Sequence, residues 1–481
     1  MSHIEALKSL QNLLGAKGYT TDPDTMAPWL TDWRGRYQGR AAALLSPAST
    51  ADVAAVVAIA AEHRIGLVPQ GGNSGMVAGA TPDNSGANVL LSLRRMNTIQ
   101  HYDDDSGLVT AQAGVILQNL HEHVAVYRRR FPLTLGGKGS ATVGGLISTN
   151  AGGTQVLRHG TMRQLVDGIE AVLPDGSIYH GLAPLKKDNR GYDLKHLLIG
   201  AEGTIGVVTG AVLRTVPALI DRSTVWAGVS SPDAAYRLLL FIQKQAASAL
   251  EGFEILPQRA LDAVLRHIDG TRAPLTSPHR WHVLMEFVQD RTEQIAPTQL
   301  AEQLLSKAIA AGLIDDATLS ASEAQAEAFW KIRDSIAEAE RAAGPAVQHD
   351  ISVPVADMAR FIEVETPMVE ARFGGTSVVA FGHLGDGNIH YHVKAPAGVD
   401  PAAWYADEAE TISSYVYDRV ATYHGSISAE HGIGFAKIHQ LARLSDPARL
   451  VAMRGVKTAF DPHNIMNPGK LVPLASAPTA P

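Results

Sequence analysis

The sequence predicts an α+β protein in which a nucleotide-binding domain is followed by a second α+β domain with longer helices. From about residue 41 to residue 217, short β-rich runs such as 66–69 and 88–93 alternate with glycine clusters, and few helical patterns occur. From about residue 218 to residue 375, longer helical stretches separate strand-like runs. Strand–helix–strand groups of this kind favour an antiparallel sheet with helices packed on it.

Individual elements are predicted from periodicity and from glycine or proline boundaries. In the first domain we expect a helix over 50–63 and short helices near Leu117 and Tyr192. In the second domain we expect helices over 231–248, 297–311 and 322–342, and strands over 224–229, 281–287 and 347–353. An N-terminal amphipathic helix is expected to have Ile4, Leu7, Leu10 and Leu14 on one face.

These patterns divide the chain into five segments. They are a helical lead-in (1–40), the nucleotide-binding domain (41–217), a substrate domain (218–425), a C-terminal segment that completes the site (426–473) and a disordered tail (474–481). A length of 481 residues is typical of roughly two to four domains.

Composition excludes several function classes. The net charge of −7 provides no basic field for a nucleic-acid backbone. With no cysteine, the chain has no disulfide, iron–sulfur cluster or thiol nucleophile. The N-terminus lacks the pattern of a signal peptide, and no apolar run of about 18 residues predicts a membrane span. We therefore expect a cytoplasmic protein without a transmembrane segment.

Three glycine clusters predict a site for a diphosphate. They are 69–75 (PQGGNSG), 136–145 (GGKGSATVGG) and 150–153 (NAGG). Bare backbone lets a chain approach an anion closely and direct several N–H groups at it. A single cluster would be an ordinary tight turn, but three within about 85 residues favour a binding site. None has the dinucleotide-binding or P-loop pattern, so loops rather than one helix N-terminus would hold the diphosphate.

A histidine-rich hairpin predicts a metal site. Asp386-Gly387 is a two-residue turn signal, which would place His383 directly opposite His390, with His392 on the same face as His390. Opposed side chains have Cβ atoms about 4.5–5.5 Å apart, a spacing that lets two imidazoles bind one ion. The alternative is a hairpin with ordinary cross-strand histidines.

A second motif, Glu430-His431-Gly432-Ile433-Gly434, follows a long helical pattern and a β-like run at 425–428. Its carboxylate could complete a set of two histidines and one acid, which suits zinc first and manganese or iron(II) as alternatives. The residue pattern by itself leaves metal binding and a purely structural role open.

The chain from about residue 44 to residue 216 resembles the FAD-binding domain of the vanillyl-alcohol oxidase / p-cresol methylhydroxylase (PCMH) flavoprotein superfamily. Four motifs match in order: VPQGGNSGMVAG (68–79), PLTLGGKGSATVGGLISTNAGG (132–153), KKDNRGYDLKHLLIGAEGTIGVVT (186–209) and NPGK (467–470). Within this superfamily the chain is similar to the D-2-hydroxyglutarate and D-lactate dehydrogenase branch. The resemblance implies a two-subdomain PCMH-type FAD-binding domain, an α+β cap domain with an antiparallel sheet and a C-terminal helical segment.

The resemblance also implies which residues bind FAD. They are Pro69, Gln70, Gly71, Gly72, Asn73, Ser74, Gly75, Gly139, Ser140, Gly144, Gly145, Asn150, Gly152, Gly153, Glu202, Gly203, Val208 and Asn467. Covalent members of the superfamily often carry a histidine at the position of Asn73. Because this chain has asparagine there and no cysteine, we expect non-covalent FAD.

The motifs GHLGDGNIH (382–390) and EHGIG (430–434) match the metal motifs of that branch and imply His383, His390 and Glu430 as ligands. A 2-hydroxy acid would bind the ion through its carboxylate and hydroxyl, His431 would take the hydroxyl proton, and the α-hydrogen would leave as hydride to the flavin. The alternative role of His431 is to orient Glu430.

Arg333, in the motif Trp330-x-x-Arg333 before Asp350–Pro354, matches the substrate arginine of the branch. A guanidinium suits this role because it can bind a carboxylate in a bidentate manner. Pairing with a carboxylate from elsewhere in the fold is the alternative. Asn388, His392 and Gln348 are expected beside the substrate. D-2-hydroxyglutarate dehydrogenases usually carry lysine at the position of Gln348, a hydroxyl residue near Ala337 and asparagine at the position of His392.

These departures favour D-lactate or another D-2-hydroxy acid without a distal carboxylate, with D-2-hydroxyglutarate as the alternative. A flavin-binding electron-transfer subunit without turnover and a metal-dependent hydrolase are more distant alternatives. An electron-transfer flavoprotein, a quinone or a cytochrome would accept the electrons, and oxygen remains open. A homodimer is expected.

Overall fold

The computed structural model describes residues 3–292 and 294–474. All but the first residue of the predicted tail, 474–481, lies outside the described residues. The chain forms two compact units. The first comprises residues 1–153, 159–217 and 430–481, and the second comprises residues 154–158 and 218–429.

The first unit contains short strands and short helices. In chain order they are α1 (His3–Gly18), β1 (Tyr19–Thr20), α2 (Pro23–Met26), the 3₁₀ helix η1 (Ala27–Trp29), β2 (Leu44–Leu45), α3 (Thr50–His63), β3 (Leu67–Gln70), β4 (Val89–Ser92), β5 (Ile99–Asp103), β6 (Leu108–Gln112), α4 (Leu117–Ala125), β7 (Arg129–Arg130), α5 (Val143–Ser148), α7 (Met162–Leu165), β8 (Val166–Val172), β9 (Ile178–Gly181), α8 (Leu194–Leu198), β10 (Val207–Arg214), β11 (Val216–Pro217), α16 (Ile438–Leu444) and α17 (Pro447–Phe460). The short helix α6 (Val156–His159) crosses the boundary between the units.

Two main sheets organise the first unit. One has the order β1-β2-β4-β3, with parallel pairing among β2, β4 and β3, and the other has the antiparallel order β5-β6-β10-β8-β9. A buried core lies on each. The last helices belong to this unit although they follow the second unit in sequence, because Met466 bridges Leu67 and the Lys457 ammonium donates to the carbonyl oxygen of Thr204 at 2.8 Å.

The second unit contains one seven-stranded antiparallel sheet. Its elements are β12 (Asp221–Val229), α9 (Pro232–Ala246), β13 (Leu250–Pro257), α10 (Gln258–His267), β14 (Trp281–Gln289), α11 (Pro297–Ala310), β15 (Asp316–Leu319), α12 (Glu323–Asp334), α13 (Ile336–Ala342), β16 (Ala346–Ser352), α14 (Val355–Arg372), β17 (Ser377–His383), β18 (Asn388–Lys394) and α15 (Pro401–Thr422). The strand order is β15-β12-β14-β13-β17-β18-β16.

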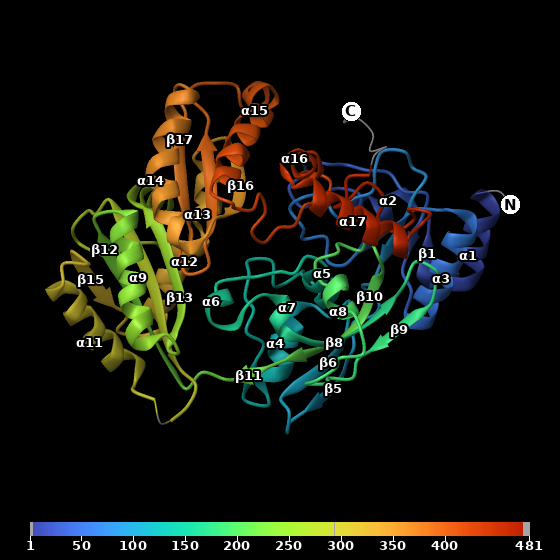
Figure 1. The fold of residues 1–481 in the computed structure, drawn as a ribbon, viewed down its shortest axis with the longest axis horizontal. Helices are drawn as coiled ribbons and strands as arrows, with labels where there is room; N and C mark the ends of the chain where they lie inside the picture. Colours follow the sequence, from blue (N-terminus) through green and yellow to red (C-terminus); the bar gives the residue numbers. More distant parts are fainter. Residues whose placement is uncertain (1–2, 293, 475–481) are drawn as a thin grey trace. The chain divides into compact units, whose positions relative to one another are not determined.

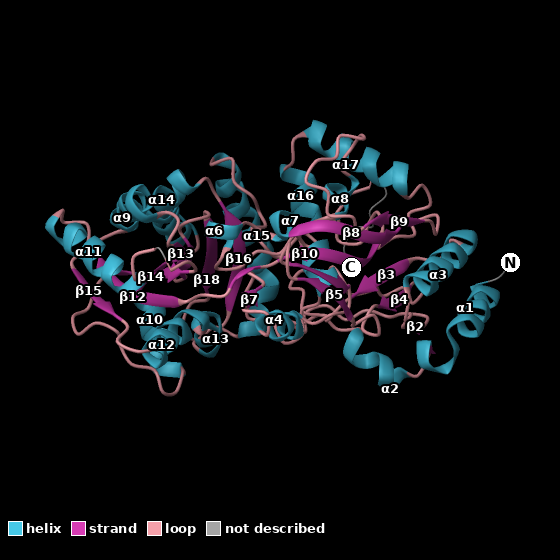
Figure 2. Ribbon diagram, turned by 90° about the horizontal axis from the view of Figure 1, so that it is seen from below, coloured by secondary structure: helices cyan, strands magenta, loops and turns pink. Residues whose placement is uncertain are grey.

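Helices cover both faces of this sheet. Figure 2 shows α9, α11 and α14 on one face and α10, α12 and α13 on the other. The second face holds a core around Trp226, Leu284 and Phe381. The expected antiparallel sheet with packed helices is therefore confirmed.

Three local expectations were wrong. The predicted helix over 322–342 is two helices that meet at Ser335, the residue between the end of the first and the start of the second. The side chain of Ile4 is 65% exposed, whereas Leu10 is buried against α3, so the buried face of α1 excludes Ile4. The short helix expected near Tyr192 is α8, which begins two residues later at Leu194.

The third wrong expectation is the hairpin register. His383 pairs with Asn388 and Phe381 pairs with His390, so the turn contains four residues, Leu384–Gly387, and not two. Strand pairing stops early because the N–H of Leu384 donates to the carbonyl of Phe253 on β13 at 3.0 Å, and the N–H of Gly387 closes the turn on the carbonyl of His383. Because the register differs by two residues, the histidines still share one face of the sheet.

Candidate active site

In the first unit, the three glycine clusters lie against one another. A Cβ atom on Gly72 would be 1.7 Å from the carbonyl oxygen of Ser140, and one on Gly71 would be 2.1 Å from Oγ1 of Thr142. A Cβ on Gly153 would be 2.1 Å from the carbonyl oxygen of Thr134. These glycines are therefore required for close approach between the loops. By contrast, a Cβ on Gly75 would have no heavy atom within 4 Å, so the 69–75 loop has open space beside it.

The side chains of Asn73 and Gln70 join the 69–75 loop to the lead-in segment by hydrogen bonds. Nδ2 of Asn73, a residue with φ of 52°, donates to the carbonyl oxygen of Thr31 at 2.8 Å. Nε2 of Gln70 donates to the carbonyl oxygens of Trp29 and Ala80 at 3.0 and 2.9 Å. Both residues thus have a structural role in the loop.

Five buried side-chain oxygens in this unit have no hydrogen-bond partner among the described residues. Three of them lie in or beside the motifs predicted to bind FAD: Oε1 of Gln70, Oγ1 of Thr142 and Oδ1 of Asn467. Burying a polar atom without a hydrogen bond costs free energy. An atom of this kind that has no partner in the protein therefore usually bonds to a water molecule or a bound ligand. FAD carries amino, imide and hydroxyl donors, and these acceptors together with the bare glycine loops fit that cofactor.

Several other residues predicted to bind FAD also contact other parts of the protein. Oδ1 of Asn150 accepts hydrogen bonds from Thr161 and from the N–H of Arg163. Val208 is buried in the core of the five-stranded sheet. The carboxylate of Glu202 accepts the N–H groups of Ile433 and Gly434, each at 2.7 Å. Glu202 therefore holds the EHGIG loop.

In the second unit, the sheet face covered by α12 and α13 brings the predicted histidines together. His383 and His390 have ring centroids 5.5 Å apart, and the ring of Phe381 contacts both His390 and His392. Asn388, opposite His383 in the register, donates to Oδ1 of Asp350 at 2.9 Å.

Gln348 lies opposite His392 on the same face of the sheet. This pair is next to the Asp350–His390 pair, two residues away along each strand. Lys394 follows on this face and is paired with Glu340 of α13 at 3.2 Å. Ala337 is exposed on α13.

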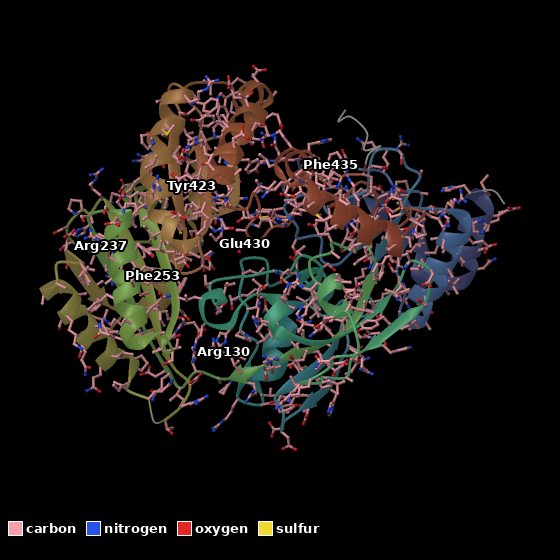
Figure 3. The ribbon with its side chains drawn as sticks, viewed as in Figure 1. Arg130, Arg237, Phe253, Tyr423, Glu430 and Phe435 are labelled. Carbon is pink, nitrogen blue, oxygen red and sulfur yellow. The ribbon has the colours of Figure 1, made fainter. Side chains whose placement is uncertain are left out.

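Glu254 is a buried acid that the sequence reasoning missed. It lies on β13 opposite His383, next to Phe253, which is labelled in Figure 3. Its carboxylate contacts Nδ1 of His383 at 2.5 Å and accepts a hydrogen bond from Nε of Arg333 at 2.7 Å. Arg333 therefore has the carboxylate partner that the sequence left open. No local pattern signals Glu254, which lies 129 positions before His383.

The charged groups in this cluster shift one another's pKa values. Burial alone raises the pKa of Glu254, but the charges of Arg333 and His383 outweigh burial and hold that pKa well below its usual range. Burial alone lowers the pKa of His383, but the charge and hydrogen bond of Glu254 outweigh it and raise the pKa to about 9. Glu254 is therefore ionised at neutral pH.

Glu430 is the first residue after the second unit and is labelled in Figure 3. Four residues earlier, Ser426 bridges Ser352 at the end of β16, so the chain connection keeps Glu430 near the end of that strand. His383 and His390 are side by side on one face of the second unit, with Asp350 opposite His390 in the register. Glu430, the first residue after that unit, is the carboxylate that the motifs group with these histidines.

The donor set fits a divalent ion. Two imidazoles and one carboxylate suit zinc, manganese and iron(II). Asp350 is a further acid beside this set that the sequence reasoning did not assign.

Comparisons with known proteins agree with this fold. The family model "FAD binding domain" matches residues 41–181, and "FAD linked oxidases, C-terminal domain" matches residues 220–471. The chain therefore belongs to the FAD-linked oxidases.

Within that class, similar proteins carry more specific names. The chain is 34% identical to D-2-hydroxyglutarate dehydrogenase, mitochondrial, of Arabidopsis thaliana, over 96% of this chain and 80% of that protein. It is 33% identical to D-2-hydroxyglutarate dehydrogenase of Xanthomonas citri pv. viticola, over 98% of each. It is also 33% identical to a putative D-lactate dehydrogenase, mitochondrial, of Schizosaccharomyces pombe, over 96% of this chain and 87% of that protein.

Solved structures share the fold at low identity. An alkyldihydroxyacetonephosphate synthase has a TM-score of 0.73 at 16% identity, with 98% of this chain and 86% of the other covered. A p-cresol methylhydroxylase has a TM-score of 0.70 at 14% identity, with 97% and 96% covered. The expected PCMH-type architecture is confirmed. In the part of the chain that the structure describes, no helix is long and apolar enough to cross a membrane.

Proposed function

We propose that this protein is an FAD-dependent dehydrogenase that oxidises a D-2-hydroxy acid to the 2-oxo acid at a divalent metal ion. The observation that carries the proposal is a pair of histidines, His383 and His390, side by side on one face of the sheet in a chain that belongs to the FAD-linked oxidases. The names of the relatives, D-2-hydroxyglutarate and D-lactate dehydrogenases, support the same substrate class.

Two bound groups would supply the chemistry that side chains lack. FAD accepts a hydride, and a divalent ion lowers the pKa of a coordinated hydroxyl. In this chain the loops at 69–75, 136–145 and 150–153 would hold FAD. His383, His390 and Glu430 would hold the ion, with zinc as the first choice and manganese or iron(II) as alternatives.

His431 is the proposed base for the substrate hydroxyl. It follows Glu430 directly, and its Nε2 lies 3.5 Å from Oε1 of that residue. A base must lie within hydrogen-bond reach of the proton that it takes, and neighbouring a ligand places it beside a coordinated substrate. Its contact with Glu430 also supports the alternative role of orienting that ligand.

Arg333 is proposed to attract the substrate carboxylate to this face. Its Nε is bound to Glu254, and an NH2 nitrogen lies 3.3 Å from Nε2 of His383, so the guanidinium is held beside a proposed metal ligand. A fixed cation next to the ion suits a substrate that carries a carboxylate adjacent to its hydroxyl carbon.

We favour a substrate without a distal carboxylate, such as D-lactate. The face beyond His390 presents Gln348 and His392, and the cation further along, Lys394, is already paired with Glu340. D-2-hydroxyglutarate is the second candidate, because several relatives at 33–35% identity carry that name. Because neither Ala337 nor Gln348 carries a positive charge, other groups would then have to bind the distal carboxylate.

The electron acceptor is proposed to be an electron-transfer flavoprotein, a quinone or a cytochrome, and a homodimer remains a prediction. The cytoplasmic location also remains a prediction, since the names of the plant and animal relatives say mitochondrial.

Anaerobic flavin bleaching with a panel of D- and L-2-hydroxy acids tests the proposal. We expect D-acids to reduce the flavin and L-acids to leave it oxidised. A flavin that no 2-hydroxy acid reduces, in protein that contains FAD and a divalent ion, would overturn the proposed function. Faster bleaching by D-2-hydroxyglutarate than by D-lactate would decide for the second candidate.

A further inference from the structure

One buried carboxylate joins two residues of the proposed site. Glu254 is 1% exposed and bonds through one oxygen to Nδ1 of His383 and through the other to Nε of Arg333. The β13–β17 pairing sets this arrangement, because Glu254 and His383 are directly opposed in the register. Arg333 comes from α12, which packs on the same face.

We propose that Glu254 is a positioning residue that fixes His383 as a metal ligand through Nε2 and holds Arg333 beside it. This inference rests on the proposed function, since it concerns the same metal site. A metal-binding histidine almost always donates its second ring N–H to a carboxylate, a carbonyl or a water, and that partner fixes the tautomer and the ring orientation.

The contacts of His383 select one tautomer. Nδ1 faces Glu254 at 2.5 Å, and a carboxylate can only accept, so the proton is on Nδ1. Nε2 faces an NH2 group of Arg333 at 3.3 Å, and a guanidinium can only donate, so Nε2 carries the lone pair whenever the ring is neutral. A metal ion binds only the neutral ring and displaces the second proton, and both partners then favour the tautomer that offers Nε2 to the ion.

The same carboxylate restrains Arg333. With its Nε fixed on Glu254, the planar guanidinium has a defined orientation, and its terminal nitrogens lie toward His383. Glu254 therefore links the group proposed to bind the ion with the group proposed to attract the substrate carboxylate, through hydrogen bonds from one side chain. Loss of this carboxylate should disturb both.

A matched control distinguishes positioning from simple burial of charge. Glu286 lies on the adjacent strand β14, is also buried, and accepts a hydrogen bond from Nε1 of Trp330 on the same helix α12 at 2.7 Å. Trp330 and Arg333 are one helical turn apart on α12. Among the described residues, however, no hydrogen bond joins Glu286 to His383. Glu286→Gln thus removes a comparable buried acid from the same face of the sheet.

The experiment measures the Zn²⁺ affinity of metal-stripped, FAD-containing protein by competition with a chromogenic chelator. We expect Glu254→Gln to weaken Zn²⁺ binding about 10–100-fold, the usual effect of removing the partner of a ligating histidine. Glu286→Gln should remain within about 3-fold of the wild type, and FAD content should be unchanged in both. Equal losses in the two variants, or wild-type affinity in Glu254→Gln, would overturn the inference. A wild-type protein that binds no Zn²⁺, Mn²⁺ or Fe²⁺ would instead refute the metal site of the proposed function.

A second measurement does not depend on the folding of a variant. Imidazole ¹⁵N spectra of the Zn²⁺-loaded wild-type protein, with His383 assigned through His383→Gln, should show a protonated Nδ1 and a metal-bound Nε2. Metal ligation through Nδ1, or a proton on Nε2, would overturn the inference whatever the variants do.

Discussion

Glu202 accepts a hydrogen bond from the backbone N–H of Gly434 at 2.7 Å, although 232 positions separate the two residues. Its other oxygen accepts the N–H of Ile433, and Asn467 donates to its carbonyl oxygen. The glycine-rich FAD-binding domain and the EHGIG loop are therefore joined within the first unit by one buried side chain.

We predict that Glu202→Gln slows flavin reduction by about 10²-fold, because the amide cannot accept both N–H groups and small displacements of a reacting group can cost that much. FAD content should stay at the wild-type level. Anaerobic stopped-flow spectroscopy measures the rate, with Glu170→Gln, a partly buried acid of the same unit, as the control. Loss of FAD from Glu202→Gln, with a normal rate after reconstitution, would mean that Glu202 serves the cofactor and not the loop.

We predict that FAD is bound non-covalently, because Asn73 occupies the position of the linking histidine and its amide is engaged with the carbonyl oxygen of Thr31. Acid precipitation should release the yellow flavin into the supernatant. Colour that remains in the washed, denatured pellet would contradict this prediction.

We predict that His390→Ala loses most of the bound divalent ion, with a fall in metal affinity of at least about 10–100-fold, since even partners of ligands have effects of this size. Metal content is measured by plasma emission spectroscopy on protein with known FAD content. FAD should remain bound, because the glycine clusters belong to the other unit. Full metal content in this variant would remove His390 from the ligand set.

We predict that His431→Asn lowers the rate of flavin reduction by about 10²–10⁴-fold with substrate still able to bind, as expected for loss of a positioned base. Rapid-reaction kinetics separate the reduction rate from the substrate Kd. If metal content falls together with the rate, His431 orients Glu430 rather than accepting the proton. An unchanged rate would make His392 the next candidate for the base.

We predict that Gln348→Lys improves kcat/KM for D-2-hydroxyglutarate relative to D-lactate, because it adds a cation opposite His392 on the substrate face. Gln348→Met is the matched control, since it has a similar size and no charge. The ratio of the two kcat/KM values is the measured quantity. An unchanged ratio would show that the substrate tail points away from this strand.

The sequence by itself determined the class of fold and much of the chemistry. Glycines in three clusters specify loops without Cβ atoms. A Cβ atom added at Gly71, Gly72 or Gly153 would collide with a neighbouring loop. The two-residue period of a strand placed His390 and His392 on one face, and His383 shares that face because the observed register differs from the expected one by two residues, an even number.

Only the tertiary structure decided the partners of these residues. The hairpin register follows from the bond between Leu384 and Phe253 on β13, a strand that the sequence places far away. Glu254 meets His383 because β13 lies beside β17 in the sheet, and Arg333 meets Glu254 because α12 packs on that face. Local patterns specify which way a side chain points, whereas the order of strands in a sheet depends on long-range pairing, for which the spacing of residues along the chain carries no signal.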